Sequence, residues 1–272
     1  MRAWSFLMVL MALLAAAALI LVSCGGTAVR EGDTGNGGLD QVQPADNHFS
    51  FLVCGDPNGR TDLLAEIVAR MEEGEFLVIV GDLTTGGDLP GMEEMREFLD
   101  AEGIEYYVMP GDNDQPAGDV SAFQAVFGPD YYSVDIKDAH LVFLNNAVAG
   151  VGLPREELDW LRQDLEEAEG KTIVALAHVP PGAPVEMGDA ADLAREDESN
   201  SEAVDLLEQA GAEVIYCGHL HVYLPYSSGP PRIVVSGGAG ANLHFSEEAG
   251  GYHHFLRVTV EGDQVSEEVI RL

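Results

Sequence analysis

Residues 49–58 are FSFLVCGDPN and residues 76–82 are FLVIVGD. In both stretches a mostly apolar run, rich in aromatic and branched residues, ends directly in Gly-Asp. Short apolar runs bounded by glycine and aspartate are typical of buried strands. We therefore predict strands at Phe49–Cys54 and Phe76–Val80, each followed by a polar side chain at its carboxyl end.

Helical patterns separate these two strands from each other and from a third strand, Tyr106–Met109. Residues 61–71 carry apolar side chains at helical spacing and end near Gly74, and residues 92–101 repeat this plan before Gly103. The alternation of strand and helix predicts right-handed crossovers and parallel strands. Residues just past the carboxyl ends of parallel strands gather on one rim of the sheet, where ligands bind.

The rest of the chain mixes helices with hairpins. Lys137-Asp138 and Gly262-Asp263 have the composition of hairpin turns. Further strands are predicted at Tyr131–Val134, Leu141–Leu144, Thr172–Ala177, Val214–Cys217, Arg232–Ser236, Phe255–Val260 and Val265–Ile270, and helices at Pro154–Ala168 and Val204–Gln209. Parallel units followed by hairpins predict a mixed sheet, or two stacked sheets with helices outside.

Five of the predicted strands end on side chains that bind metals in other proteins. These side chains are Asp56 and Asn58, Asp82, Asp112 with Asn113 and Asp114, His178, and His219 with His221. If the strands share one rim, carboxylate, amide and imidazole groups converge there. Oxygen and imidazole ligands together suit Mn, Fe, Zn or Mg ions. The pattern predicts a two-metal hydrolase.

Taken in order, these motifs resemble the calcineurin-like metallophosphoesterase family. Its pattern is Asp-x-His, Gly-Asp, Gly-Asn-His followed by Asp or Glu, a lone His, and Gly-His-x-His. The resemblance extends over residues 48–260 and includes Tyr132–Asp135, Leu141–Asn145, Glu157–Leu161 and His178–Pro181. It implies an α/β fold of the metallo-dependent phosphatase type, an α/β/β/α sandwich in which helices flank two stacked mixed sheets.

The resemblance also implies two divalent metal ions and a division of the ligands between them. Asp56, Asn58, Asp82 and His221 would hold one ion, and Asp82 would bridge to a second ion held by Asp112, His178 and His219. The implied reaction is hydrolysis of a phosphomonoester, phosphodiester or phosphoanhydride by in-line attack of a metal-bridging hydroxide.

Three residues depart from the family pattern. Asn58 and Asn113 stand where the family has histidines, and Asp112 stands where it has asparagine. The harder oxygen ligands favour Mn or Mg over Zn at the first position, with Mn preferred. Asn113 cannot act as a general acid, a loss that typically costs about 10²–10⁴-fold in rate. Asp114, next to it, is a second catalytic candidate that would donate a proton through water.

These departures leave two functions open: an active phosphoesterase, or a degenerate member that binds metal or a phosphate ligand without significant turnover. Arg60 and Asn145 are candidate substrate-binding residues; Arg60 is alternatively a surface arginine at a helix start, and Asn145 a loop cap. His244, after the Gly237–Gly240 loop, is a further histidine that could face the site, although a structural role is expected for it. A nuclease or nucleotide hydrolase also stays open.

The chain is strongly acidic, with 47 Asp and Glu against 13 Lys and Arg and a formal net charge of −34. Such a surface repels long nucleic acids and anionic lipids. It also repels phosphate, so a phosphatase needs a locally positive pocket, which two divalent ions would supply. We expect a small phosphorylated substrate and no specific protein partner.

The first residues resemble a bacterial lipoprotein signal. Arg2 precedes the apolar run Phe6–Val22, and Leu21–Cys24 forms a lipidation box. A plain secretory signal and a membrane anchor are the alternatives. We expect a signal peptide at 1–23, a flexible tether at 24–47 and a metallophosphoesterase domain at 48–272, exported and lipid-anchored at the cell envelope. The stretch Pro181–Asn200 is either a lid over the rim or a surface loop.

Two cysteines remain after Cys24. Cys54 and Cys217 each precede a predicted ligand by two residues. We expect both to be buried as small hydrophobic side chains, with a disulfide or a soft metal ligand as the alternatives.

Overall fold

The computed structural model describes residues 48–181, 198–226 and 230–272 of the chain. The predicted signal, Cys24 and tether, and most of the predicted lid, lie outside these residues. The described residues belong to one compact unit, Pro44–Leu272. None of the helices within the described ranges combines the length and apolarity needed to cross a membrane.

The first sheet contains five strands in the order β11-β10-β1-β2-β3. Strands β1 (His48–Cys54), β2 (Leu77–Val80) and β3 (Tyr106–Met109) are parallel. Strand β10 (His254–Glu261) pairs antiparallel with β1 and with β11 (Gln264–Arg271). The predicted C-terminal hairpin is confirmed, and Gly262 takes the left-handed conformation, φ 62°, that its turn needs.

The second sheet contains six strands in the order β4-β5-β6-β7-β9-β8. Its parallel centre is β5 (Ala139–Leu144), β6 (Thr172–Ala177), β7 (Val214–Cys217) and β9 (Arg232–Ser236). Strands β4 (Tyr132–Ile136) and β8 (Tyr223–Pro225) add antiparallel edges.

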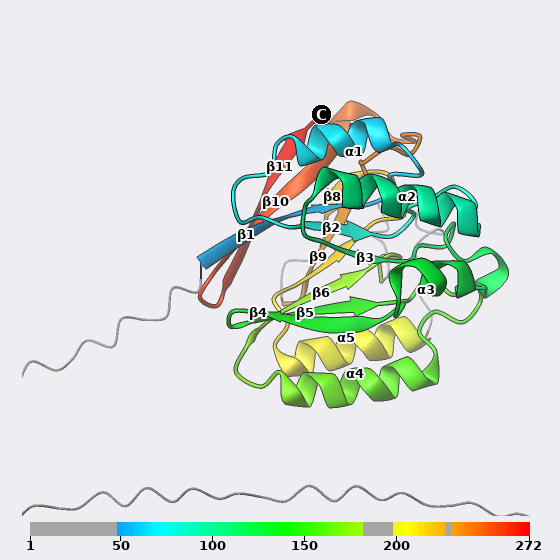
Figure 1. The fold of residues 1–272 in the computed structure, drawn as a ribbon. Coiled ribbons are helices and arrows are strands. Elements are labelled where there is room, and N and C mark those ends of the chain that lie inside the picture. The colour runs from blue at the N-terminus through cyan, green and yellow to red at the C-terminus, as the bar shows by residue number, and fades with distance from the viewer. Residues whose placement is uncertain (1–47, 182–197, 227–229) are drawn as a thin grey trace, which may run out of the picture. The chain divides into compact units, whose positions relative to one another are not determined.

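Helices cover the outer face of each sheet (Figure 1). The first sheet packs against α1 (Thr61–Val68), α2 (Leu89–Glu102) and α3 (Ser121–Phe127), and the second against α4 (Arg155–Glu167) and α5 (Glu198–Ala210). Short 3₁₀ helices occupy Pro116–Gly118 and Glu247–Ala249. Two mixed sheets between helical layers confirm the predicted α/β/β/α sandwich.

The core follows the alternation of side chains along the strands. Phe51 and Val53 of β1 face Phe143 and Leu176 of the second sheet in a shared apolar layer, while Leu52 of β1 points the other way, toward α1 and α2. All five are fully buried. A buried Leu or Phe stabilises the fold by about 1.5–3 kcal/mol relative to an exposed one. This layer fixes the two sheets against each other.

The predicted element boundaries differ from the structure mainly by a few residues. Helix α2 begins at Leu89 because Asp88 caps it, its side chain accepting a hydrogen bond from the Gly91 amide, 3.0 Å. Within the described ranges, the short elements missed are α3, the three-residue strand β8 and the 3₁₀ helices Pro116–Gly118 and Glu247–Ala249. Helix α3 has Phe123, Val126 and Phe127 at helical spacing, but it is only seven residues long, too short for this spacing to be recognised.

Candidate metal centre

The loops that follow β1, β2, β3, β6 and β7 meet at the adjoining carboxyl ends of the two sheets, as predicted. Asp56 and Asn58 follow β1, Asp82 follows β2, and residues 112–114 follow β3. His178 directly follows β6, and residues 219–221 follow β7. Side chains separated by more than a hundred residues along the chain therefore share one small volume.

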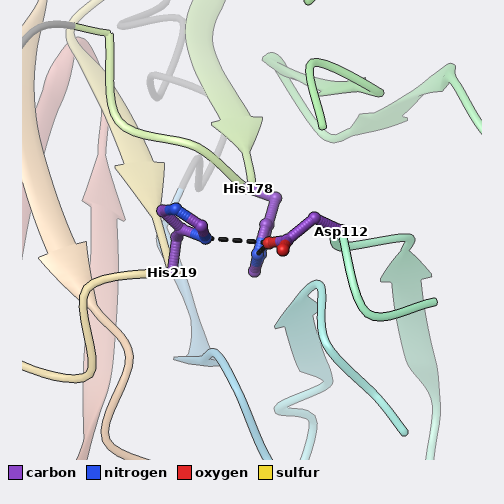
Figure 2. A group of neighbouring side chains, drawn as sticks. All are labelled: Asp112, His178 and His219. Carbon is purple, nitrogen blue, oxygen red and sulfur yellow. Dashed lines mark hydrogen bonds and ion pairs between the residues drawn. The ribbon is translucent and has the colours of Figure 1, made fainter. Parts of the chain in front are cut away.

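One cluster of candidate ligands contains Asp112, His178 and His219 (Figure 2). The Oδ1 atom of Asp112 lies 2.8 Å from Nδ1 of His219 and 3.1 Å from Nε2 of His178. The two imidazole rings lie edge to face, with centroids 5.2 Å apart. The loops after three strands, β3 of the first sheet and β6 and β7 of the second, thus bring one carboxylate and two imidazole nitrogens together.

A second cluster contains Asp56, Asp82 and His221, whose ligand atoms all lie within 4.8 Å of one another. Nε2 of His221 is 3.5 Å from Oδ1 of Asp56. Asp82 also connects the two clusters, because its Oδ1 is 3.4 Å from Nε2 of His178. Asp82 therefore occupies the position between two adjacent donor sets.

Backbone carbonyls fix which imidazole nitrogen faces each cluster. Nδ1 of His178 lies 2.8 Å from the carbonyl oxygen of Val80, and Nδ1 of His221 lies 2.8 Å from that of Asn242. A carbonyl only accepts hydrogen bonds, so each Nδ1 carries the proton and donates it, and Nε2 of each ring is turned toward the carboxylates. Such an orienting hydrogen bond is a common accompaniment of metal-ligating histidine.

The backbone of the site is strained. Five non-glycine residues there have positive φ angles, namely Asp56, Asn58, Asp82, His219 and His221, between 46° and 69°. Left-handed conformations of non-glycine residues cost of order 1–3 kcal/mol each and concentrate at functional sites. Each of these turns sends the chain sharply away from a strand end and leaves the side chain at the rim.

Two glycines make room for this convergence. A Cβ on Gly81, whose φ is +87°, would lie 2.4 Å from Nδ1 of His178, and a Cβ on Gly111 would lie 2.2 Å from Oδ1 of Asp82. No larger residue fits at either position without displacing a candidate ligand.

The site concentrates buried charge. Asp56 and His178 are fully buried and Asp82 is 2% exposed. Burial, helped by the charges of Asp56 and Asp112, raises the pKa of Asp82 to about 7. Burial opposes the charged form of His178, but Asp82 and Asp112 outweigh it and raise its pKa to about 10. Burial likewise opposes ionisation of Asp112, yet the hydrogen bonds from His178 and His219 hold its pKa well below its usual range.

These shifts have one physical cause: carboxylates packed away from water require nearby positive charge. Protons on the imidazoles supply part of it when the protein groups are alone. Divalent cations would supply it more fully, and carboxylate oxygens with imidazole nitrogens are a donor set that such ions accept. The described residues therefore fit two divalent ions, one at each cluster.

Asn58 and Asn113, the two departures from histidine, are bonded to each other. Nδ2 of Asn113 donates to Oδ1 of Asn58, 3.1 Å, and to Oδ2 of Asp82, 2.7 Å. The backbone amide of Asn113 donates to Oδ1 of Asp82, 2.9 Å. Both oxygens of Asp82 thus receive a hydrogen bond from Asn113, and Asn58 lies beside the second cluster.

Asp114 is fully buried and acts on the backbone. Its carboxylate accepts hydrogen bonds from the amides of Leu83, Thr84 and Gly111 at 2.9–3.0 Å. Burial outweighs these bonds and raises its pKa. These hydrogen bonds connect the loop after β2 to the loop after β3, and so fix the position of Asp82 relative to Asp112.

The two candidate substrate-binding residues have protein partners. The side chain of Asn145 is buried, where it accepts from Gln115 Nε2 at 2.7 Å and donates to Asp130 at 2.8 Å. Arg60 is exposed and makes a two-pronged pair with Asp62, both contacts 2.8 Å. Neither side chain is directed at the clusters by a hydrogen bond within the described residues.

Two neighbouring side chains, Asn146 and Gln115, position residues of the site; from the sequence Asn146, like Asn145, is a candidate for substrate contact or for capping the loop. Asn146 Oδ1 accepts from the amides of His178, 3.1 Å, and Val179, 2.9 Å, and so orients the loop that carries His178. Gln115 holds Asn145, but nothing in its own stretch of sequence marks it. Cys54 and Cys217 are buried free thiols in two different apolar clusters, as expected.

Comparison with known proteins adds independent evidence. The family model for calcineurin-like phosphoesterases matches residues 49–223. No curated protein sequence matches the chain. The purple acid phosphatase PPD1 from yellow lupin (Lupinus luteus) seeds superposes with a TM-score of 0.65 at 15% identity, covering 83% of this chain and 52% of that one.

Two further solved structures share the fold. GAP50, the anchor in the inner membrane complex of Plasmodium, gives a TM-score of 0.62 at 12% identity over 83% of this chain and 85% of its own. A putative 5′-nucleotidase from Staphylococcus aureus gives 0.55 at 13% identity over 82% and 54%. The chain spans about half the length of the lupin and staphylococcal proteins. At such identities these likenesses show a common fold.

Proposed function

The chain belongs to the calcineurin-like phosphoesterase family, and we propose that it hydrolyses phosphoester or phosphoanhydride bonds with two divalent metal ions. The observation that carries this proposal is the pair of three-residue donor clusters connected by Asp82. Two neighbouring metal positions are an arrangement that stabilises both the attacking and the leaving oxygen of an in-line phosphoryl displacement.

Each cluster would hold one ion. Asp112, His178 and His219 would bind the first, and Asp56, Asp82 and His221 the second, with the amide oxygen of Asn58 alongside. When bound, the ions would lower the pKa of water and neutralise phosphoryl oxygens. Three carboxylates in the donor set favour a hard ion, and we propose manganese.

The chain's own side chains limit the substrates. Asn113 donates hydrogen bonds to Asp82 and Asn58 but has no proton to give to a departing oxygen. Substrates whose leaving group needs no proton, such as aryl phosphates and phosphoanhydrides, should therefore react best.

The alternative is a protein that binds metal or a phosphate ligand without turnover. The hydrogen bond between Asn58 and Asn113 favours it, because it engages both departures from histidine with each other. The two functions share the same metal clusters and differ only in whether bond cleavage follows.

We also propose an exported protein, lipid-anchored through Cys24 at the cell envelope, acting on small phosphorylated compounds. This proposal rests on the Leu21–Cys24 box. The acidic surface disfavours long nucleic acids as substrates.

The test is metal analysis of purified protein, followed by turnover of 4-nitrophenyl phosphate and a nucleoside diphosphate with Mn, Fe, Mg or Zn. We expect about two ions per chain and metal-dependent phosphate release. Asp82→Asn should weaken both metal positions and lower the rate by at least about 10³-fold, since it removes the shared charge. Asp159→Asn, an exposed aspartate on α4, is the matched control.

Bound metal without turnover of any substrate would support the non-catalytic alternative. A protein that binds none of the four ions would refute both functions.

A further inference from the structure

A phosphate substrate needs hydrogen-bond donors at a site lined by carboxylates, and the basic residues of the described ranges are engaged elsewhere. Every lysine and arginine there contacts a carboxylate or a backbone carbonyl. Arg60, the one that follows a ligand loop, pairs with Asp62. If the proposed function holds, a further donor beside the clusters would add to the phosphate binding that the metal ions supply.

His244 is a donor in the right place. It is exposed, and its ring stacks on His221 with centroids 5.2 Å apart and 22° between the ring planes. Within the described ranges, no hydrogen bond engages its ring nitrogens. The stacking therefore places an imidazole with an available N–H directly against His221, a candidate ligand of the Asp56–Asp82–His221 cluster.

The loop that carries His244 is fixed to that cluster. The Ala239 amide donates to the carbonyl of Gly55 at 3.0 Å, and the Ala241 amide to that of Asp56 at 2.9 Å. The Asn242 carbonyl accepts from Nδ1 of His221 at 2.8 Å. A Cβ on Gly240 would lie 2.5 Å from the carbonyl oxygen of Pro57, so the loop packs closely there. His244 is therefore held two residues beyond an anchored turn.

Asn113 borders the same cluster, through Asp82 and Asn58. The imidazole of His244 and the amide of Asn113 thus adjoin the same metal position. Residue 113 is asparagine where the family pattern has histidine, and His244 supplies an imidazole beside the same donor set.

We propose that His244 contacts the substrate, donating an imidazole N–H hydrogen bond to a phosphoryl oxygen beside the Asp56–Asp82–His221 cluster. This assignment deepens the proposed function and rests on it. The residue determines how tightly the phosphate group is bound, and its role differs from that of His221, which faces the metal position.

The experiment compares wild type, His244→Ala and His244→Gln as full-length protein loaded with manganese. Binding of inorganic phosphate is measured by calorimetry, and its inhibition constant and the KM and kcat for 4-nitrophenyl phosphate by kinetics. Metal content is measured on the same samples. His253→Gln is the control: His253 contacts the Gly238 carbonyl at 3.0 Å, so its loss perturbs the same loop without removing His244.

We expect His244→Ala to weaken phosphate binding by about 10-fold or more, as loss of a hydrogen bond to a charged group does, with two ions still bound. His244→Gln, which keeps an N–H donor, should recover most of the affinity, and His253→Gln should bind phosphate like wild type. Stacking alone would not be rescued by glutamine.

Three outcomes would overturn the assignment. Unchanged phosphate affinity in His244→Ala, with wild-type turnover intact, would refute it and leave the proposed function standing. Lost metal in that variant would show that His244 only supports His221. A metal-loaded wild type that neither binds phosphate nor turns over would refute the proposed function and this inference together.

Discussion

Glu157 of α4 is expected to make the fold less stable as pH rises. The residue is 1% exposed; Oε1 accepts from the Asn145 amide at 2.7 Å, and Oε2 has no hydrogen-bond partner among the described residues. Burial, reinforced by the charge of Asp130 and only partly offset by the Asn145 hydrogen bond, raises its pKa from 4.5 to about 8. The folded protein therefore holds this proton more tightly than the unfolded chain does.

The sign follows from proton binding. The stabilisation due to protonated Glu157 is complete below pH 4.5 and is lost as pH rises through about 8. The full difference between these two pKa values corresponds to about 5 kcal/mol, since one pKa unit is about 1.4 kcal/mol. Relaxation around the charge reduces this, and we expect about 2–5 kcal/mol.

Glu157→Gln tests this value because the amide keeps the Oε1 acceptor and cannot ionise. Its unpaired NH₂ costs about 1–3 kcal/mol at every pH, so the informative quantity is the change in the stability difference with pH. Urea unfolding at pH 5 and pH 9 should show the variant gaining about 2–4 kcal/mol relative to wild type between the two, because about 1 kcal/mol of the full difference is already lost below pH 5. Glu156→Gln, an exposed neighbour on the same turn, should show no such gain. A stability difference that is equal at both pH values would refute the reasoning.

Two further predictions follow from other contacts. Asn113→His should restore a proton donor and raise kcat by about 10²–10⁴-fold for alkyl phosphates but far less for aryl phosphates; a rate loss on both would show that Asn113 itself works in catalysis. His140→Gln should destabilise the fold by about 1 kcal/mol at pH 5.5 and less at pH 9 in urea unfolding. Burial lowers the pKa of His140, but its hydrogen bonds to Asp164, 2.9 Å, and Asp135, 2.8 Å, outweigh burial, so the pKa is raised. The stabilisation that protonated His140 contributes is therefore lost as pH rises through this raised pKa. Equal losses of stability at pH 5.5 and pH 9 would contradict the prediction.

The sequence predicted the sandwich and the positions of its strand ends because both depend on local patterns. An apolar run such as Leu77–Val80 must be buried, and the Gly-Asp that follows must leave the sheet. The order of ligand loops along the chain then identified the cluster members Asp56, Asp82, Asp112, His178, His219 and His221 together.

The sequence could not predict which polar side chains at the rim are hydrogen-bonded to other parts of the protein and so point away from the clusters. Asn145 ends a strand just as Asp82 does, yet its side chain is enclosed by Gln115 and Asp130, thirty and fifteen residues away. Asp114 is adjacent to the catalytic candidate Asn113, yet its oxygens face three backbone amides. Hydrogen bonds across such separations depend on the packing of loops, for which single-sequence periodicity gives no signal.

The strained backbone of the site does not separate a metal-binding site from a phosphate-binding one, but the hydrogen-bond donors near the clusters bear on that difference. Five left-handed residues and a nearly enclosed Asp82 cost free energy that bound metal ions would offset in either function. A protein that only holds metal needs no group that contacts a phosphoryl oxygen. The exposed ring of His244, positioned by an anchored loop beside the cluster that Asn113 also borders, is such a group. A contact between His244 and a phosphate group would therefore separate a phosphate-binding site from one that holds metal alone, and turnover by the wild type separates catalysis from binding.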